Sequence, residues 1–184
     1  VDEYFWLRNR EDPEVQKYLT VQMDYLDEIT GHTKPLQEAL FSEMKARIQE
    51  TDSTVPEERG GYLYYQRTEA GRQYPIFCRR RNVAGSPEEV LLDQNALAEG
   101  RIFCSVGALA VSPDGSKLAY SVDYGGDETY TVHIRDLENN KEYPETIPNA
   151  YGSVYFHTGL EWANDNETLF YGTLDEAKRP FQLF

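Results

Sequence analysis

The sequence predicts a mainly β fold with N-terminal helices, namely a partial β-propeller of about two and a half blades preceded by a two-helix segment. The main observation is a self-match at a spacing of 51 residues, in which residues 109–120 recur as 160–171 without a gap. Repeats of roughly 40–50 residues are typical of propeller blades. The second observation is a change at Gly60 from helical to strand-like hydrophobic periodicity.

Residues 1–58 are expected to form the N-terminal helical segment, and residues 59–184 the first blades of an incomplete propeller domain. Asp12 is suited to cap a helix that starts at Pro13, because proline has no N–H to lose at the first helical position. Apolar residues then recur at helical spacing as far as Ile29. Gly31 is a natural stop for this helix.

A second helix is expected to begin near Pro35 and to end near residues 51–53, ahead of Pro56. Its apolar stripe advances in four-residue steps through Leu36, Leu40, Met44 and Ile48. Both helices are amphipathic, so each must bury a stripe against something. They can pack on each other or on a domain outside this chain, and the sequence leaves both possibilities open.

Three strands are expected after Gly60, over residues 62–67, 74–79 and 89–93. The first two flank the segment Glu69-Ala70-Gly71-Arg72, which is a candidate hairpin turn. Tyr65 precedes Tyr120 by 55 residues, which is close to the repeat length. This segment is therefore interpreted as a divergent first unit.

The second unit is expected to contain strands over residues 108–111, 118–122 and 129–135. Pro113 and Gly115 favour a tight turn between the first two strands, because proline presets one turn dihedral and glycine accepts positive φ. The segments 123–128 and 136–141 form the next two turns. Each unit thus offers three or four short antiparallel strands.

The third unit stops at Phe184, partway through the repeat. Since propellers close with roughly four to eight blades, the chain is expected to be a piece of something larger. Open sheet edges and uncovered blade faces favour self-association or a partner. The alternatives are an ordinary antiparallel sheet protein with two helices and a complete small α+β domain.

The charge excludes one class of partner. There are 32 acidic and 18 basic residues, for a net charge of −14, whereas nucleic-acid binding requires clustered Lys and Arg. The short run Arg79-Arg80-Arg81 is expected to be split between two faces of a strand. No stretch approaches the roughly 20 apolar residues that span a bilayer, so no membrane contact is expected.

Cysteine usage and motifs predict no cofactor and no metal. The two cysteines, Cys78 and Cys104, form no C-x-x-C pair and fit a reducing compartment, which favours a cytoplasmic location. The segment nearest to a G-x-S-x-G nucleophile elbow is 103–107, where Phe103 replaces the first glycine. Ser105 is therefore interpreted as an ordinary strand or loop serine.

The three histidines share no ligand spacing, and each is assigned a structural role rather than a catalytic one. His32 follows a helix stop and is suited to cap it, His133 falls in a strand, and His157 precedes a Thr-Gly turn. Asp114 and Asp165 occupy equivalent turns and are expected to accept hydrogen bonds from the turn backbone. A calcium site there is the weaker alternative, since no other carboxylates follow at loop spacing.

Several segments in order along the chain resemble the N-terminal part of the oligopeptidase B group in the prolyl oligopeptidase family of serine peptidases. The segments that carry the resemblance are 2–8, 12–15 with 18–19, 43–48, 62–65, 73–76, 89–93, 112–115 and 162–166. A single piece such as Ser-Pro-Asp-Gly is common in propellers, but the full series in this order is specific. The resemblance spans essentially the whole chain.

This resemblance implies a propeller that caps a C-terminal α/β-hydrolase domain, which carries a Ser, Asp and His triad and hydrolyses short peptides after Lys or Arg. The propeller in such enzymes restricts the access of folded proteins. No triad residue maps onto this chain, so we expect no catalytic residue within it, and the substrate-binding residues are unknown. The rival hypothesis is a non-catalytic propeller that serves as a protein-interaction platform.

Overall fold

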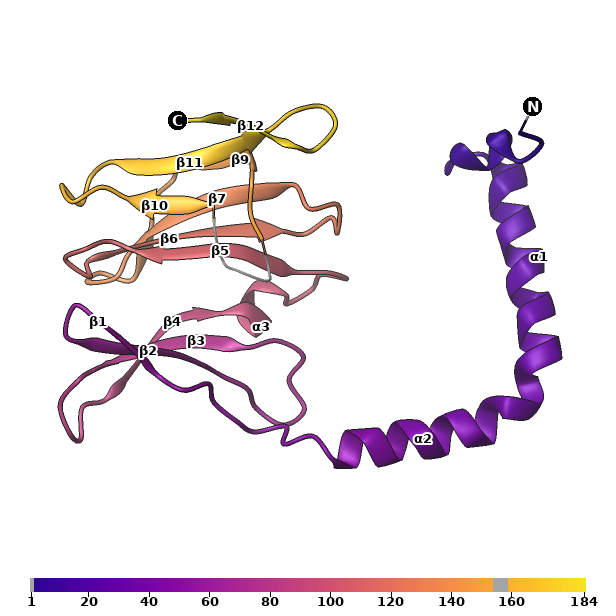
Figure 1. Ribbon diagram of the computed structural model, residues 1–184, viewed down its shortest axis with the longest axis horizontal. Helices are drawn as coiled ribbons and strands as arrows, with labels where there is room; N and C mark the ends of the chain where they lie inside the picture. Colours follow the sequence, from indigo (N-terminus) through magenta and orange to yellow (C-terminus); the bar gives the residue numbers. More distant parts are fainter. Residues whose placement is uncertain (1, 154–158) are drawn as a thin grey trace. The chain divides into compact units, whose positions relative to one another are not determined.

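The computed structural model describes residues 2–153 and 159–184 (Figure 1). The chain divides into two units, Val1–Gln49 and Glu50–Phe184. The first unit is helical and the second contains all the described strands. The predicted class, mainly β with N-terminal helices, is therefore confirmed.

The helical unit contains the short 3-10 helix η1 (Phe5–Arg8), the helix α1 (Pro13–Thr30), the 3-10 turn η2 (Gly31–Thr33) and the helix α2 (Lys34–Ala46). Asp12 caps α1 as predicted, since its carboxylate accepts a hydrogen bond from the backbone N–H of Glu14 at 2.9 Å. Gly31 ends α1, but its φ is −53°, so it does not supply a left-handed cap. The chain instead tightens into η2 and continues directly into α2.

The predicted end of α2 near residues 51–53 was wrong, because the helix ends at Ala46. The backbone N–H groups of Arg47 and Ile48 bond to the carbonyls of Met44 and Lys45, three residues back. This tightening closes the last turn in the 3-10 manner. The start was predicted correctly, with Pro35 in the first turn of the helix.

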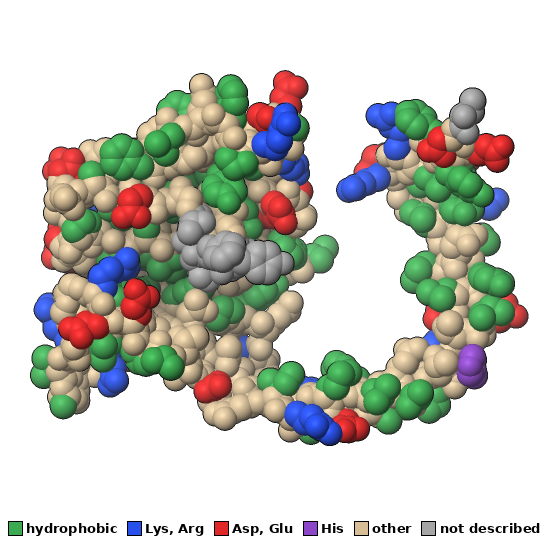
Figure 2. All heavy atoms as spheres, in the orientation of Figure 1, with side chains coloured by type: hydrophobic (Ala, Val, Ile, Leu, Met, Phe, Trp, Pro, Cys, Tyr) green, Lys and Arg blue, Asp and Glu red, His purple; other side chains and the backbone are tan. Residues whose placement is uncertain are grey.

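The apolar stripes of both helices are exposed within their unit. Val15 is buried at 1% exposure, and α2 contributes no buried residue. Figure 2 shows apolar side chains along the surface of these helices. The exposed members of the stripes are Leu19, Leu26, Ile29, Leu36, Leu40, Phe41, Met44 and Ile48. The helices thus present surfaces that their own unit does not cover.

The first blade is a four-stranded antiparallel sheet in the order β1 (Glu57–Arg59), β2 (Tyr62–Arg67), β3 (Ile76–Arg81) and β4 (Glu88–Asp93). The predicted hairpin turn is confirmed by a hydrogen bond from the N–H of Arg72 to the carbonyl of Glu69 at 3.0 Å. β3 starts after Pro75, two residues later than expected, because proline lacks the N–H that a paired strand donates. The sequence did not predict β1 or the short helix α3 (Gln94–Leu97).

The second blade consists of β5 (Ser105–Val111), β6 (Lys117–Asp123), β7 (Tyr130–Asp136), β8 (Lys141–Glu142) and β9 (Ile147–Ala150). The third consists of β10 (Leu160–Trp162), β11 (Leu169–Leu174) and β12 (Pro180–Leu183). The strands are hydrogen-bonded to one another in the order β10-β11-β9-β7-β6-β5. In addition, β12 pairs with β11, and β8 pairs with β7. The strands at a spacing of 51 residues are equivalent, so that β11 corresponds to β6 and β12 to β7.

Two apolar cores lie where neighbouring blades face each other. The first joins Phe77 and Leu92 of the first blade to Leu118 and Tyr120 of the second. The second joins Ala119 and Val132 of the second blade to Leu160 and Trp162 of the third. Apolar burial between neighbouring blades is the packing of a propeller. The prediction of a partial propeller is confirmed (Figure 1).

Candidate functional site

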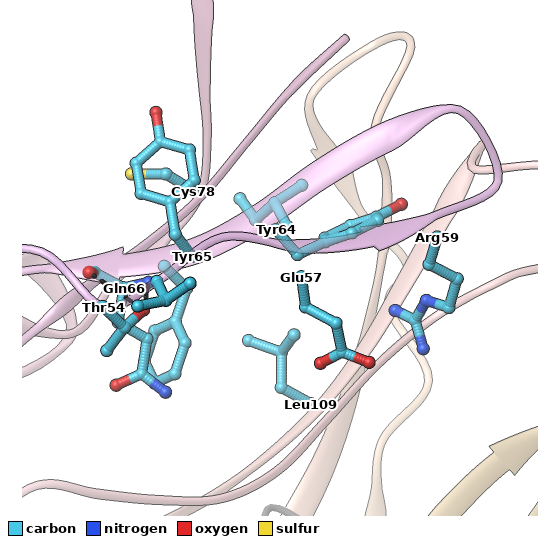
Figure 3. Close-up of a pocket in the computed structure, with 11 residues that line it drawn as sticks. Thr54, Glu57, Arg59, Tyr64, Tyr65, Gln66, Cys78 and Leu109 are labelled. Atoms are coloured by element: carbon cyan, nitrogen blue, oxygen red, sulfur yellow. Dashed lines mark hydrogen bonds between the residues drawn. The ribbon is translucent and has the colours of Figure 1, made fainter. Parts of the chain in front are cut away.

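Residues of β1, β5 and β10, the first strands of the three blades, contribute to the lining of two pockets in the β unit. One pocket of about 380 Å³ lies between β1 and β2 of the first blade and Leu109 on β5 of the second. Figure 3 shows the Glu57 and Arg59 side chains on the same side of the ribbon as Leu109. Tyr65 and Cys78 lie on the opposite side, as expected from the alternation of a strand.

A second pocket of about 300 Å³ adjoins the first, because Arg59 and Tyr64 line both. It takes in all three blades, since its wall also contains the turn Ser112–Gly115 of the second blade and Glu161 and Trp162 of the third. Pockets of this kind, in which several elements converge, are frequent ligand sites. We therefore treat the surface along β1, β5 and β10 as the candidate functional site.

Arg59, Tyr62 and Tyr64 of the first blade line this site, and three arginines lie against the two tyrosine rings. The guanidinium of Arg59 lies 4.8 Å from the ring centre of Tyr64. Those of Arg79 and Arg81 lie 4.4 and 4.7 Å from the ring of Tyr62. The pairing of Arg79 and Arg81 on one ring agrees with the predicted split of this run between two faces. Cation–π contacts of this type attract the guanidinium groups to the tyrosine rings.

Arg79 also fastens the first blade to the second. It is buried, and it donates to Glu89 Oε2 at 2.7 Å and to the carbonyl of Gly115 at 2.7 Å. The carbonyl belongs to the tight turn of the next blade. A buried guanidinium with a carboxylate, a carbonyl and an aromatic face as partners is well compensated for its desolvation.

A polar cluster lies on the other face of the first blade. The Tyr65 hydroxyl donates to Glu88 Oε2 at 2.8 Å, and Arg67 Nε donates to Glu88 Oε1 at 3.0 Å. Burial and the bond to Glu88 raise the pKa of Tyr65 to about 12. Burial also raises the pKa of the adjacent Cys78 thiol to about 11. Tyr65 and Cys78 are therefore both protonated and unreactive near neutral pH.

The second and third blades are joined by bonds between equivalent turns. The backbone N–H of Asp114 donates to Asn166 Oδ1 at 2.9 Å, and Lys117 Nζ donates to the carbonyl of Asn166 at 2.7 Å. The indole N–H of Trp162 donates to the carbonyl of Ala110 at 3.0 Å. Each of these contacts joins residues about one repeat length apart in the sequence. The repeat length therefore indicated which parts of the two blades would be neighbours.

Ser105 begins β5 and is partly buried, which agrees with its interpretation as a strand serine. His32 Nδ1 lies 3.0 Å from the carbonyl of Ile29 at the end of α1, as expected for a capping side chain. His133 lies in β7, where its ring stacks on that of Tyr120. His157 lies outside the described residues. Within the β unit, no hydrogen bond between described residues joins Ser105 to His133.

Asp114 and Asp165 accept backbone hydrogen bonds in their turns, as predicted. Asp114 Oδ1 accepts from the N–H of Ser116 at 3.0 Å, and Asp165 Oδ1 accepts from the N–H groups of Glu167 and Thr168 at 2.9 Å. The hydroxyl of Thr168 adds a further bond, and together these donors lower the pKa of Asp165 to about 2.

Across residues 2–153 and 159–184, no group of three His, Cys, Asp or Glu side chains is placed to hold a metal ion. In the same part of the chain, Cys78 and Cys104 are buried free thiols. None of the described helices is long and apolar enough to traverse a lipid bilayer.

Stacked antiparallel sheets, cores between the blades and bonds between equivalent turns define the class of protein as a β-propeller, of which these residues form the first blades. The family model for the prolyl oligopeptidase N-terminal β-propeller domain matches residues 1–182. The chain belongs to this family.

Relatives and solved structures agree with this assignment. Protease 2 of Moraxella lacunata is 34% identical over 188 residues, and dipeptidyl aminopeptidase BI of Pseudoxanthomonas mexicana is 37% identical over 187 residues. The aligned segments cover 100% and 92% of this chain, but 27% and 25% of the two relatives. The chain therefore spans about a quarter of the length of these peptidases.

Two oligopeptidase B structures share the fold over nearly the whole chain. The enzyme from Leishmania major gives a TM-score of 0.88 at 30% identity, covering 99% of this chain and 26% of the other. The enzyme from Trypanosoma brucei, with covalently bound antipain, gives a TM-score of 0.85 at 37% identity, covering 100% and 25%.

Proposed function

We propose that these residues are the N-terminal propeller part of a serine oligopeptidase that hydrolyses short peptides after Lys or Arg. The observation that carries this proposal is the 37% identity over the full chain to the oligopeptidase B of Trypanosoma brucei. The acidic excess of the chain, with a net charge of −14, favours the approach of cationic peptides. The proposed location is cytoplasmic.

The proposed partner within the parent protein is a C-terminal α/β-hydrolase domain that supplies the nucleophile. That domain would carry out acyl transfer through a serine ester, with a histidine as base and an oxyanion hole. The propeller, residues 59–184, would limit access to the active site, and the helical segment, residues 1–58, would supply docking surface. The exposed apolar stripes of α1 and α2 support this docking role.

The test of the activity uses the natural full-length protein that contains these residues. It is expected to react with a fluorophosphonate probe and to cleave blocked Arg and Lys esters far faster than the matching Ala ester. The 184-residue chain alone should remain unlabelled by the probe. Stoichiometric labelling of the chain alone, or equal cleavage of Ala and Arg esters by the parent, would overturn the proposal.

The gating role has its own test, based on the bonds that fasten the first two blades. Arg79→Ala in the parent removes the bonds to Glu89 and Gly115, whereas Arg81→Ala removes only the contact of an exposed side chain with Tyr62. The first variant is expected to raise the cleavage of a long peptide relative to a dipeptide ester. Equal ratios in both variants and the wild type would argue against gating by the blades.

A second candidate activity is the release of dipeptides from free N-termini. It is favoured by the 37% identity to dipeptidyl aminopeptidase BI of Pseudoxanthomonas mexicana. An N-terminally blocked and a free dipeptide reporter separate the two candidates, since an exopeptidase needs the free amine. A parent with no hydrolase domain and no activity on either reporter would support a non-catalytic interaction platform.

A further inference from the structure

His133 lies on the face of the second blade that meets the first blade. It is partly buried, and its ring stacks on Tyr120 with centroids 5.4 Å apart and an interplanar angle of 21°. Tyr120 belongs to the core that also contains Phe77, Leu91 and Leu92 of the first blade. The imidazole is therefore next to the seam between β4 on one side and β6 and β7 on the other.

The same seam contains a charged bridge between the blades. Arg135 donates from one amino group to the carbonyl of Leu91 on β4 at 2.9 Å, and from Nε to Glu142 Oε1 on β8 at 2.6 Å. The Tyr120 hydroxyl also donates to Glu142 Oε1, at 2.9 Å. The Arg135 guanidinium lies 5.5 Å from the centre of the Tyr120 ring, the ring on which His133 stacks.

Protonation of His133 would place a second cation beside Arg135 on one aromatic ring. Glu142 is the nearby anion, and it already accepts from both Arg135 and Tyr120. The carboxylates of β4 have other partners, since Glu88 binds Tyr65 and Arg67, Glu89 binds Arg79, and Asp93 accepts from Asn95. The positive charge of protonated His133 would therefore compete with Arg135 for the carboxylate of Glu142.

We propose that His133, Tyr120, Arg135 and Glu142 form a pH-sensitive latch between the first and second blades, which loosens when the imidazole is protonated. Histidine is the side chain whose ordinary pKa lies in the range where such a switch can act. The latch acts on the contact of Arg135 with Leu91, and the described residues that form the core between the second and third blades include no histidine. Acid should therefore loosen one seam and leave the other unchanged.

The direction of the effect follows from the pKa of His133. Burial lowers this pKa below its ordinary value, and Arg135 lowers it further, while Glu142 acts in the opposite direction. The ordinary pKa of histidine is about 6.5. Below that pH, His133 binds a proton more readily when the first and second blades have separated than when they are in contact. Opening therefore becomes easier as the pH falls, by up to about tenfold at pH 5.5.

The test is amide hydrogen exchange in the natural full-length protein, at about pH 7.5 and 5.5, with protection factors corrected for the intrinsic pH dependence of exchange. In the wild type, protection in residues 88–93 and 130–142 should fall up to about tenfold, while that in residues 160–174 stays constant. His133→Gln should abolish most of this fall. His32→Gln is the matched control, and it should behave as the wild type.

Two results would overturn the proposal. One is an equal loss of protection in His133→Gln and in the wild type. The other is a wild-type loss of the same size in residues 160–174, which would show general acid loosening. If His133→Gln does not fold, the wild-type comparison between the two seams still decides, because the third blade serves as an internal reference.

Discussion

At the scale of the residue, single aspartate carboxylates stabilise the turns of the repeat by accepting several hydrogen bonds each. Asp165 accepts two backbone N–H groups and one hydroxyl, and Asp123 accepts the N–H groups of Gly125, Gly126 and Glu128. A carboxylate that accepts several donors is stabilised in its ionised form. The turn at Asp165 therefore depends on the ionised carboxylate, and acid should weaken it.

The first prediction concerns the pH dependence that Asp165 contributes. The pKa of about 2 lies below the ordinary value of 3.8, so its contribution to stability is fully present above that ordinary value. It is lost as the pH falls through the folded pKa. In urea unfolding, Asp165→Asn should lower the midpoint at pH 6, and the difference from the wild type should shrink towards pH 2. A difference that stays constant with pH would contradict this, and Glu38→Gln on the exposed face of α2 is the control.

The second prediction concerns Gly107, which lies against a buried ring. A Cβ added at Gly107 would lie 2.6 Å from Cδ1 of Tyr130, whose side chain is 2% exposed. Gly107→Ala should therefore lower the free energy of unfolding by about 1–3 kcal/mol through overpacking. Gly125→Ala is the matched control, since its nearest neighbours would lie 3.5 Å away, and it should change stability by less than about 0.5 kcal/mol. Equal effects of the two variants in denaturant unfolding would refute the steric explanation.

At the scale of the element, the start of α1 depends on one side chain. Asp12 satisfies the N–H of Glu14, which has no partner within the helix. Asp12→Ala should destabilise the first turn by about 1 kcal/mol, whereas Asp12→Asn should retain most of the cap. Amide exchange of residues 14–17 measures this directly. Unchanged protection in Asp12→Ala would mean that contacts other than the cap hold the start of the helix.

Elements with strong local signals could be predicted from the sequence. The cap at Asp12 and the turns at Gly71 and Gly115 require particular residue types, so local chemistry was sufficient. β1 could not be found in this way, since Glu57-Glu58-Arg59 has no apolar alternation and forms a strand only through pairing with β2. α3 did carry a signal that was missed, because Asp93 caps it by accepting from the N–H of Asn95 at 2.9 Å.

The candidate site was beyond prediction from the sequence for a related reason. Its wall depends on contacts between blades, such as that of Arg79 with Gly115, and on the side chain of Arg59 from the unpredicted strand β1. Only the repeat length pointed towards such contacts. It placed Asp114 and Asn166 in neighbouring turns, although it could not specify which atoms would bond.

At the scale of the whole β unit, stability depends on the apolar cores between neighbouring blades. Each blade has two faces, and each face can form one such core. The second blade is covered on both faces by the two cores. The outer face of the third blade has no such cover among the described residues, where Phe170 is 44% and Leu183 is 76% exposed. The register that pairs Gly172 with Leu183 places Phe170 and Leu183 on one side of the sheet.

This open face leads to the last prediction, which concerns self-association of the 184-residue chain. Burial of one large apolar side chain is worth about 1.5–3 kcal/mol, and every 1.4 kcal/mol or so changes affinity about tenfold. Phe170→Glu with Leu183→Glu should therefore weaken self-association by at least about tenfold in light scattering or sedimentation. Gln22→Glu with Gln37→Glu, at exposed polar positions of α1 and α2, adds the same charge and controls for simple repulsion. If the blade face is the contact, this control pair leaves the affinity near that of the wild type. Equal weakening by both pairs would assign the effect to charge, and a wild-type chain that stays monomeric at high concentration would show that the face does not bind a second copy.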